Sequence, residues 1–252
     1  MKRFIRANWK FLLFFTVIGL IGGYFVGLYS LESYPSEMRR QIADQGITDT
    51  MMGLMTAAQS AVYGLVLGAL GIFFAEKIGL WKEDHSLTKK PLIASLIVAV
   101  FGGMAMILPD LWIFGRFSQP LLDLYAEKPT VPYILATVTY GAVIEEVMMR
   151  LFLMSLIAFL LYKIFSRKNP EVPTWCLVVA NVVSAVLFAA GHLPLNDLLF
   201  GLSPVIVIRC FLLNGGIGLL FGYLYRKYGL RYAMIAHGGC HIISKLIWIA
   251  FL

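Results

Sequence analysis

Long apolar stretches recur along the whole chain, and they restrict its fold more than any other feature of the sequence. Seven of them have the length that an α-helix needs to cross a bilayer, and they lie at 9–30, 52–75, 91–109, 131–165, 174–192, 199–225 and 231–252. Two are longer than one crossing requires, and 110–126 is semi-apolar, so an eighth helix is compatible with the sequence. We predict an all-α, polytopic transmembrane helix bundle of about seven to eight helices, with residues 1–252 forming a single integral membrane domain.

The composition agrees with a lipid environment. Of the 252 residues 60% are hydrophobic and 14% are charged, whereas a soluble domain usually has about a quarter charged residues. The net charge of +7 does not indicate nucleic acid, because the basic residues lie in short loops between apolar stretches. The predicted partner of this surface is the lipid bilayer.

The distribution of Lys and Arg predicts the orientation in the membrane. With the N-terminus in the cytoplasm, fourteen basic residues fall on the inner side and four on the outer side, as the positive-inside rule requires. The inner residues are Lys2, Arg3, Arg6, Lys10, Lys77, Lys82, Lys89, Lys90, Lys163, Arg167, Lys168, Arg226, Lys227 and Arg231, and the outer residues are Arg39, Arg40, Arg116 and Lys128. We expect a cell-membrane protein whose N-terminus is cytoplasmic.

Three ionisable residues, Glu145, Glu146 and Arg150, lie well inside the apolar stretch 131–165. Each charged group at mid-bilayer costs roughly 2.5–3.5 kcal/mol on insertion scales, so something must offset the cost. Glu146 and Arg150 are four residues apart and can pair on one helix face. Glu145 is rotated by about 100° and has no cation at i+3 or i+4, which leaves it available as a general acid or base. On charge alone, an ion pair between helices or a transporter relay explains these residues equally well.

Three of the four histidines also lie in or at the end of apolar stretches. His192 closes 174–192, and His237 and His241 are one turn apart in 231–252, while His85 lies in a charged inner loop where we expect it to be solvated. Imidazole and carboxylate groups activate water. The same set, His192, His237 and His241 with Glu145, can also bind a divalent metal such as zinc.

Three motifs occur in order along these stretches. Residues 145–150 (EEVMMR) fit EExxxR, residues 188–192 (FAAGH) fit FxxxH, and residues 237–241 (HGGCH) are similar to an HxxxN-type motif, with a Gly-rich stretch at 214–225 between the last two. Over roughly 131–245 the ordered set resembles the CPBP family, also called Abi or CAAX-protease-and-bacteriocin-processing proteins. These are intramembrane endopeptidases related to the type II CAAX prenyl endopeptidase.

The resemblance implies an intramembrane protease with no cofactor. Glu145 and His192 would activate a water for attack on a peptide carbonyl. Glu146 and Arg150 would brace the site and hold the substrate, and His237 with His241 would stabilise the oxyanion. The substrate would be a peptide or membrane protein, with or without an attached lipid.

The chain departs from the family pattern at three positions. Met149 and Leu151 replace the aromatic residue and the glycine that commonly flank the arginine, and His241 replaces an amide. An HxxxH pair suits metal ligation, so a metal-dependent variant of the same protease ranks second. A catalytically silent scaffold or bacteriocin-immunity protein is a further alternative. A proton-coupled transporter would be favoured by an internal repeat or paired broken helices, and the sequence shows neither.

The predicted boundaries place two of the candidate site residues at different depths in the membrane. They place His192 near the outer end of its helix and His237 near the inner end of its own. The two histidines can act together only if the helices are tilted or the boundaries shift.

Overall fold

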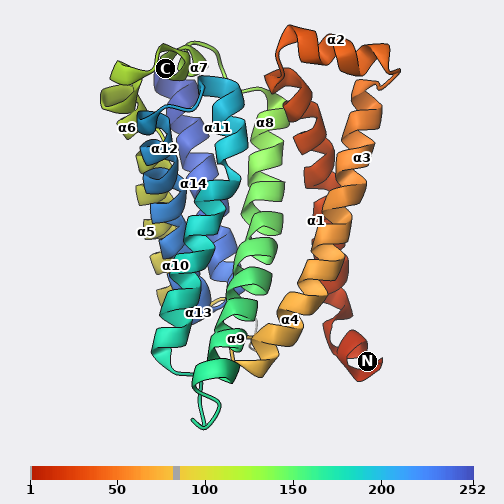
Figure 1. The fold of residues 1–252 in the computed structure, drawn as a ribbon, viewed down its shortest axis with the longest axis vertical. Helices are drawn as coiled ribbons and strands as arrows, with labels where there is room; N and C mark the ends of the chain where they lie inside the picture. The colour runs from red at the N-terminus through yellow and green to blue at the C-terminus, as the bar shows by residue number, and fades with distance from the viewer. Residues whose placement is uncertain (1, 82–85) are drawn as a thin grey trace.

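The computed structural model describes residues 2–81 and 86–252, so Lys82 and His85 of the predicted inner loop lie outside the described residues. Within the described ranges, seven helices are long and apolar enough to cross a membrane, and they pack side by side in one bundle (Figure 1). These spans are Arg3–Ser33, Asp49–Lys77, Lys89–Phe117, Val131–Phe165, Thr174–Phe200, Pro204–Tyr228 and Leu230–Phe251. The predicted all-α transmembrane bundle is confirmed, with seven spans rather than eight.

The stretch 110–126 does not form an additional span. It contains the short helices α6 (Leu108–Trp112), η2 (Phe114–Phe117) and α7 (Gln119–Ala126), which are too short to cross a bilayer. They lie near the C-terminal end of the chain at the top of Figure 1. α2 (Ser36–Asp44), which connects the first two spans, lies at the same end of the bundle but on its other side.

Glycines bring the first two spans into close contact. α1 (Lys2–Ser33) packs along α3 (Asp49–Val62), and the second span continues through η1 (Tyr63–Leu67) and α4 (Gly68–Lys77). A Cβ at Gly19 would lie 2.6 Å from the carbonyl oxygen of Ser60, and one at Gly27 would lie 2.7 Å from that of Met52. Small residues of this kind allow transmembrane helix backbones to approach closely.

The fourth span carries the EExxxR motif in an unusual backbone. It begins as α8 (Val131–Ala136), winds as π-helix through η3 (Thr137–Glu145) and η4 (Val147–Met154), and ends as α9 (Ser155–Phe165). π-Helical turns are rare and occur frequently at functional sites. Glu145 and Glu146 lie where the two π-helical segments meet.

The fifth span is interrupted at His192. Helix α10 (Thr174–Gly191) ends there, and α11 (Leu193–Phe200), with Pro194 in its first turn, continues the span to Phe200. The predicted boundary at 192 was therefore too early, because a helix break inside the span was mistaken for its end. His192 lies within the bundle, and His192 and His237 line the same cavity despite the different depths that the predicted boundaries gave them.

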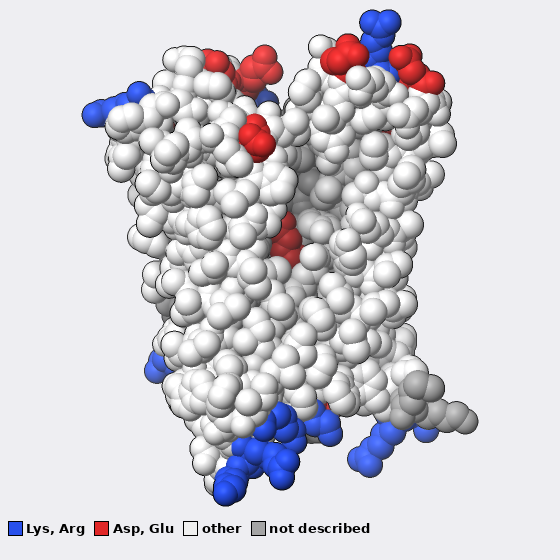
Figure 2. Space-filling view, in the orientation of Figure 1, with Lys and Arg blue, Asp and Glu red and all other residues white. Residues whose placement is uncertain are grey.

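The last two spans complete the bundle. α12 (Pro204–Cys210), η5 (Phe211–Gly215) and α13 (Gly216–Tyr228) form the sixth, and α14 (Leu230–Phe251) forms the seventh. Figure 2 shows Lys and Arg gathered mainly at the end of the bundle that carries the N-terminus, and acidic side chains mainly at the opposite end.

Candidate active site

A cavity of about 310 Å³ lies between α1, the fourth span, the helix break at His192 and α14. Its walls include Tyr29 of α1, Glu145 of η3, His192, and both His237 and His241 of α14. Figure 2 shows the face of the molecule hollowed between the two halves of the bundle, with an acidic side chain inside the hollow. The cavity lies within the spans, in the half away from the N-terminus.

The pair of Glu146 and Arg150 is confirmed and is completely internal. Their side chains are 0% and 1% exposed, and Arg150 Nη1 lies 3.2 Å from Glu146 Oε1. Arg150 Nη2 also donates to the carbonyl oxygen of Gly218 at 2.9 Å, and its guanidinium carbon lies 4.7 Å from the centre of the Phe188 ring. These contacts fit the predicted bracing role. Contact with a substrate would require access that 1% exposure does not provide.

Glu146 also orients His237. Glu146 Oε1 lies 2.9 Å from His237 Nδ1, and because a carboxylate only accepts hydrogen bonds, Nδ1 carries the hydrogen. The imidazole stacks on the Phe221 ring, with centroids 4.5 Å apart and planes 22° apart. His237 Nε2 consequently faces Glu145 Oε2 at 3.8 Å and His241 Nε2 at 3.2 Å.

A series of contacts, each with a defined donor and acceptor, continues along α14. In a neutral His237 the Nε2 atom is an acceptor, so the hydrogen shared at 3.2 Å belongs to His241 Nε2. His241 Nδ1 then accepts, and Lys245 Nζ lies 3.5 Å from it and 4.1 Å from the centre of the Tyr133 ring. The oxyanion role requires the tautomer of His241 that has its hydrogen on Nε2. This series of hydrogen bonds favours that tautomer.

Glu145 and His192 are the two site residues with access to the cavity and with unassigned acceptor atoms. The Glu145 side chain is 23% exposed. His192 Nδ1 donates to the carbonyl oxygen of Phe188 at 2.8 Å, which leaves Nε2 of the neutral ring as a base. No hydrogen bond joins Glu145 to His192 in the described structure, and the cavity that they share is large enough for several waters, each needing about 30 Å³.

The metal candidates do not assemble into a metal site. Among the described residues, no three His, Cys, Asp or Glu side chains converge as ligands would. His237 and His241 instead point their Nε2 atoms at each other at hydrogen-bonding distance. The zinc alternative stays a prediction, which a chelator series tests.

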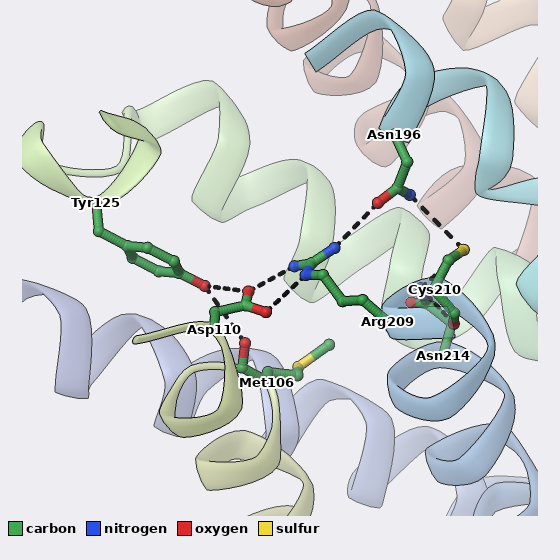
Figure 3. A network of polar contacts seen from close by, with 7 residues as sticks. All are labelled: Met106, Asp110, Tyr125, Asn196, Arg209, Cys210 and Asn214. Atoms are coloured by element: carbon green, nitrogen blue, oxygen red, sulfur yellow. Dashed lines mark hydrogen bonds and ion pairs between the residues drawn. The ribbon is translucent and has the colours of Figure 1, made fainter. Parts of the chain in front are cut away.

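A second polar network at the same cavity was missed by the sequence analysis. Arg209 of α12 makes a bidentate pair with Asp110 of α6, with distances of 2.6 Å from Nε to Oδ1 and 2.5 Å from Nη2 to Oδ2 (Figure 3). Arg209 Nη1 donates to Asn196 Oδ1 at 3.0 Å, and Asn196 Nδ2 donates to the carbonyl oxygen of His192 at 2.7 Å. This network holds the helix break that carries His192.

Tyr125 completes this network by donating from its hydroxyl to Asp110 Oδ2 at 2.8 Å. Burial, followed by the charge of Asp110, raises the pKa of Tyr125, so that the phenol remains a donor. The sequence contains a signal for the pair of Arg209 and Asp110. Arg209 is a charged residue inside the apolar stretch 199–225, and Asp110 directly follows the apolar stretch 91–109.

Comparison with known proteins agrees with the motifs. Residues 127–243 match the family model described as type II CAAX prenyl endopeptidase Rce1-like. The matched region includes Glu145, Glu146, Arg150, His192, His237 and His241. No curated protein and no solved structure matches the chain.

Proposed function

Because residues 127–243 match the type II CAAX prenyl endopeptidase Rce1-like family model, we propose that this chain is an intramembrane endopeptidase. In this proposal its catalytic water is activated by Glu145 and His192. The observation that carries the mechanism is the cavity. Its walls inside the bundle include the partly exposed carboxylate of Glu145 and His192, whose Nε2 atom accepts no hydrogen bond from the described residues.

In the proposed reaction, a water lies between the Glu145 carboxylate and His192 Nε2. As its oxygen attacks the carbonyl carbon of the scissile bond, its proton passes to one of these bases. The carbonyl π-electrons move to the oxygen, which becomes the oxyanion. When the C–N bond breaks, the proton is returned to the departing amine, so the products are a carboxylic acid and an amine.

The Nε2–H of His241 is the donor proposed for the oxyanion. In the resting protein it is directed at His237 Nε2, 3.2 Å away, and an oxyanion in the cavity would take over this hydrogen bond. Because the N–H must exchange His237 Nε2 for the oxyanion, we propose that this hydrogen bond forms during the reaction and stabilises the developing charge. Glu146 supports this geometry by accepting the hydrogen bond of His237 Nδ1, and Arg150 supports it by pairing with Glu146.

The proposed substrate is a peptide or membrane protein, lipidated or not, cleaved at the cavity in a cell membrane with the protein's N-terminus in the cytoplasm. We test the activity with purified protein in detergent and internally quenched peptide libraries, both lipidated and unlipidated. Glu145→Gln keeps the size of the side chain but removes the base, so we expect its cleavage rate to fall by roughly 10²–10⁴-fold.

The matched control is Glu171→Gln, which makes the same chemical change on the exposed loop between α9 and α10 and should leave the rate unchanged. A chelator series with zinc added back is run beside it. Chelator-sensitive activity restored by zinc would replace the water mechanism with the metal-dependent alternative. If wild type cleaves no more than Glu145→Gln across the libraries, the silent scaffold or immunity protein becomes the better description.

A further inference from the structure

A second cavity, of about 380 Å³, lies at the end of the bundle that carries the N-terminus, remote from the candidate active site. It is lined by the first half of α1, the segment that follows α4 and the junction of α13 with α14. The residues around it are Ala7, Lys10, Phe11, Phe14, Phe15, Leu80, Trp81, Tyr228, Gly229, Leu230, Arg231 and Met234. All but two of these side chains are uncharged, and the two charged ones are both basic.

Arg231 gives the cavity an unsatisfied positive group. Its Nε and Nη1 atoms are buried and have no hydrogen-bond partner in the described part of the chain. The guanidinium carbon lies 4.9 Å from the centre of the Tyr232 ring, and the group also makes a hydrogen bond with the Tyr232 side chain, so the unpaired donors are those on Nε and Nη1. Buried donors are normally paired, and a phosphate or carboxylate presents the two acceptor oxygens that this fork matches.

The backbone next to Arg231 favours the same kind of ligand. α14 is 22 residues long and begins at Leu230, directly after Gly229, whose φ of 108° makes the turn from α13. No side chain among the described residues caps this end. The first N–H groups of a helix have no intrahelical acceptor and carry partial positive charge, which attracts anions.

The remainder of the cavity suits hydrocarbon. Phe11, Phe14 and Met234 line it within the membrane spans, and Phe14 is exposed on the outer surface of α1, so the apolar part opens toward lipid. Lys10 is exposed at the rim. A free phosphate would use the basic end alone, whereas a phospholipid would use both ends.

We propose that this cavity binds one anionic phospholipid. Its phosphate would lie between Arg231, Lys10 and the first N–H groups of α14, and one acyl chain would follow the aromatic side of α1. Basic pockets between transmembrane helices are a recognised type of binding site for anionic headgroups on the cytoplasmic side, the side to which the positive-inside rule assigns this end of the bundle.

The test is native mass spectrometry of the full-length protein released from detergent, titrated with phosphatidylglycerol or with phosphatidylcholine of the same acyl chains. We expect wild type to retain one phosphatidylglycerol in preference to phosphatidylcholine. Arg231→Gln should reduce that preference by about fivefold or more, since one basic side chain near the surface contributes about that factor. Arg167→Gln, the same substitution on the exposed loop after α9, is the matched control and should keep the preference.

Two further arms separate the possible ligands. Glycerol 3-phosphate at equal concentration should not displace the lipid. Ala7→Trp, at an exposed position on the cavity wall, should weaken binding of the lipid by filling the groove while leaving both charges in place. The proposal is overturned if wild type shows no preference for the anionic lipid, if Arg167→Gln loses it as Arg231→Gln does, or if the soluble phosphate competes as well as the lipid. Circular dichroism of each variant checks that the helical fold is retained.

Discussion

The adjacent residues Glu145 and Glu146 have the same side chain and opposite surroundings. Glu146 is completely buried between Arg150 and His237, and Glu145 faces the cavity with 23% of its side chain exposed. A buried carboxylate is tolerated when it is paired, and removing its partner leaves an uncompensated charge. This physical difference supports the proposed division of roles, in which Glu146 positions His237 and Glu145 acts on water.

His241 is one of the three positions at which the chain departs from the family pattern, and its proposed role needs only a donor on the cavity side. His241→Asn supplies an amide N–H at this position, so we expect cleavage within about tenfold of wild type. His241→Leu removes the donor, and the cleavage rate should fall by roughly 10²–10³-fold, as for loss of other oxyanion donors. The measurement is the turnover of the best quenched peptide. A leucine variant as active as wild type would exclude His241 as the donor.

At the scale of elements, close packing of helices and breaks within helices position the site. The break between α10 and α11 puts His192 inside the bundle, and the network of Arg209, Asp110 and Asn196 joins this break to α6 and α12. On the other side, α1 forms one cavity wall and is itself held against α3 by its glycines.

Substitution of glycine by alanine should have opposite effects at Gly19, where α1 packs on α3, and at Gly216, the first residue of α13. Alanine at Gly19 would place its Cβ 2.6 Å from the carbonyl oxygen of Ser60, which forces the helices apart and should cost about 1–3 kcal/mol. At Gly216 a Cβ would meet nothing within 4 Å, so Gly216→Ala should be neutral or stabilising by up to about 1 kcal/mol. The midpoints of thermal unfolding in detergent report both. Equal midpoints for the two variants would contradict close packing at Gly19.

At the scale of the whole molecule, the charge distribution and the seven spans predict the orientation in the membrane. The structure places the loop at 166–173 at the N-terminal end of the bundle and α2 at the opposite end (Figure 1). If the N-terminus is cytoplasmic, α2 faces outward, and the active-site cavity lies in the outer half of the membrane.

Labelling of single cysteines tests this orientation. The natural cysteines Cys176, Cys210 and Cys240 are all buried, so they should contribute little background. With a membrane-impermeant maleimide on intact cells, we expect Arg39→Cys in α2 to be labelled in full, and Arg167→Cys to be labelled only after permeabilisation. The reverse pattern would place the N-terminus outside and would also move the proposed lipid site to the other leaflet.

Several features of this protein were determined by the sequence itself. The apolar stretches predict about seven to eight helices, because any helix in lipid must be long and apolar, and the described residues form seven spans. The pairing of Glu146 with Arg150 follows from their spacing of four residues along one helix. The order of the three motifs indicates the family, and the family model matches the same region.

Other features depend on how separate helices are placed against one another, which no local pattern encodes. The partner of His237 is Glu146, 91 residues away, and that of Arg209 is Asp110, 99 residues away. The depth of His192 also required the structure, because a proline-marked break and the end of a span have similar sequences. The tertiary structure decided these points because each depends on the rotation and register of one helix relative to another.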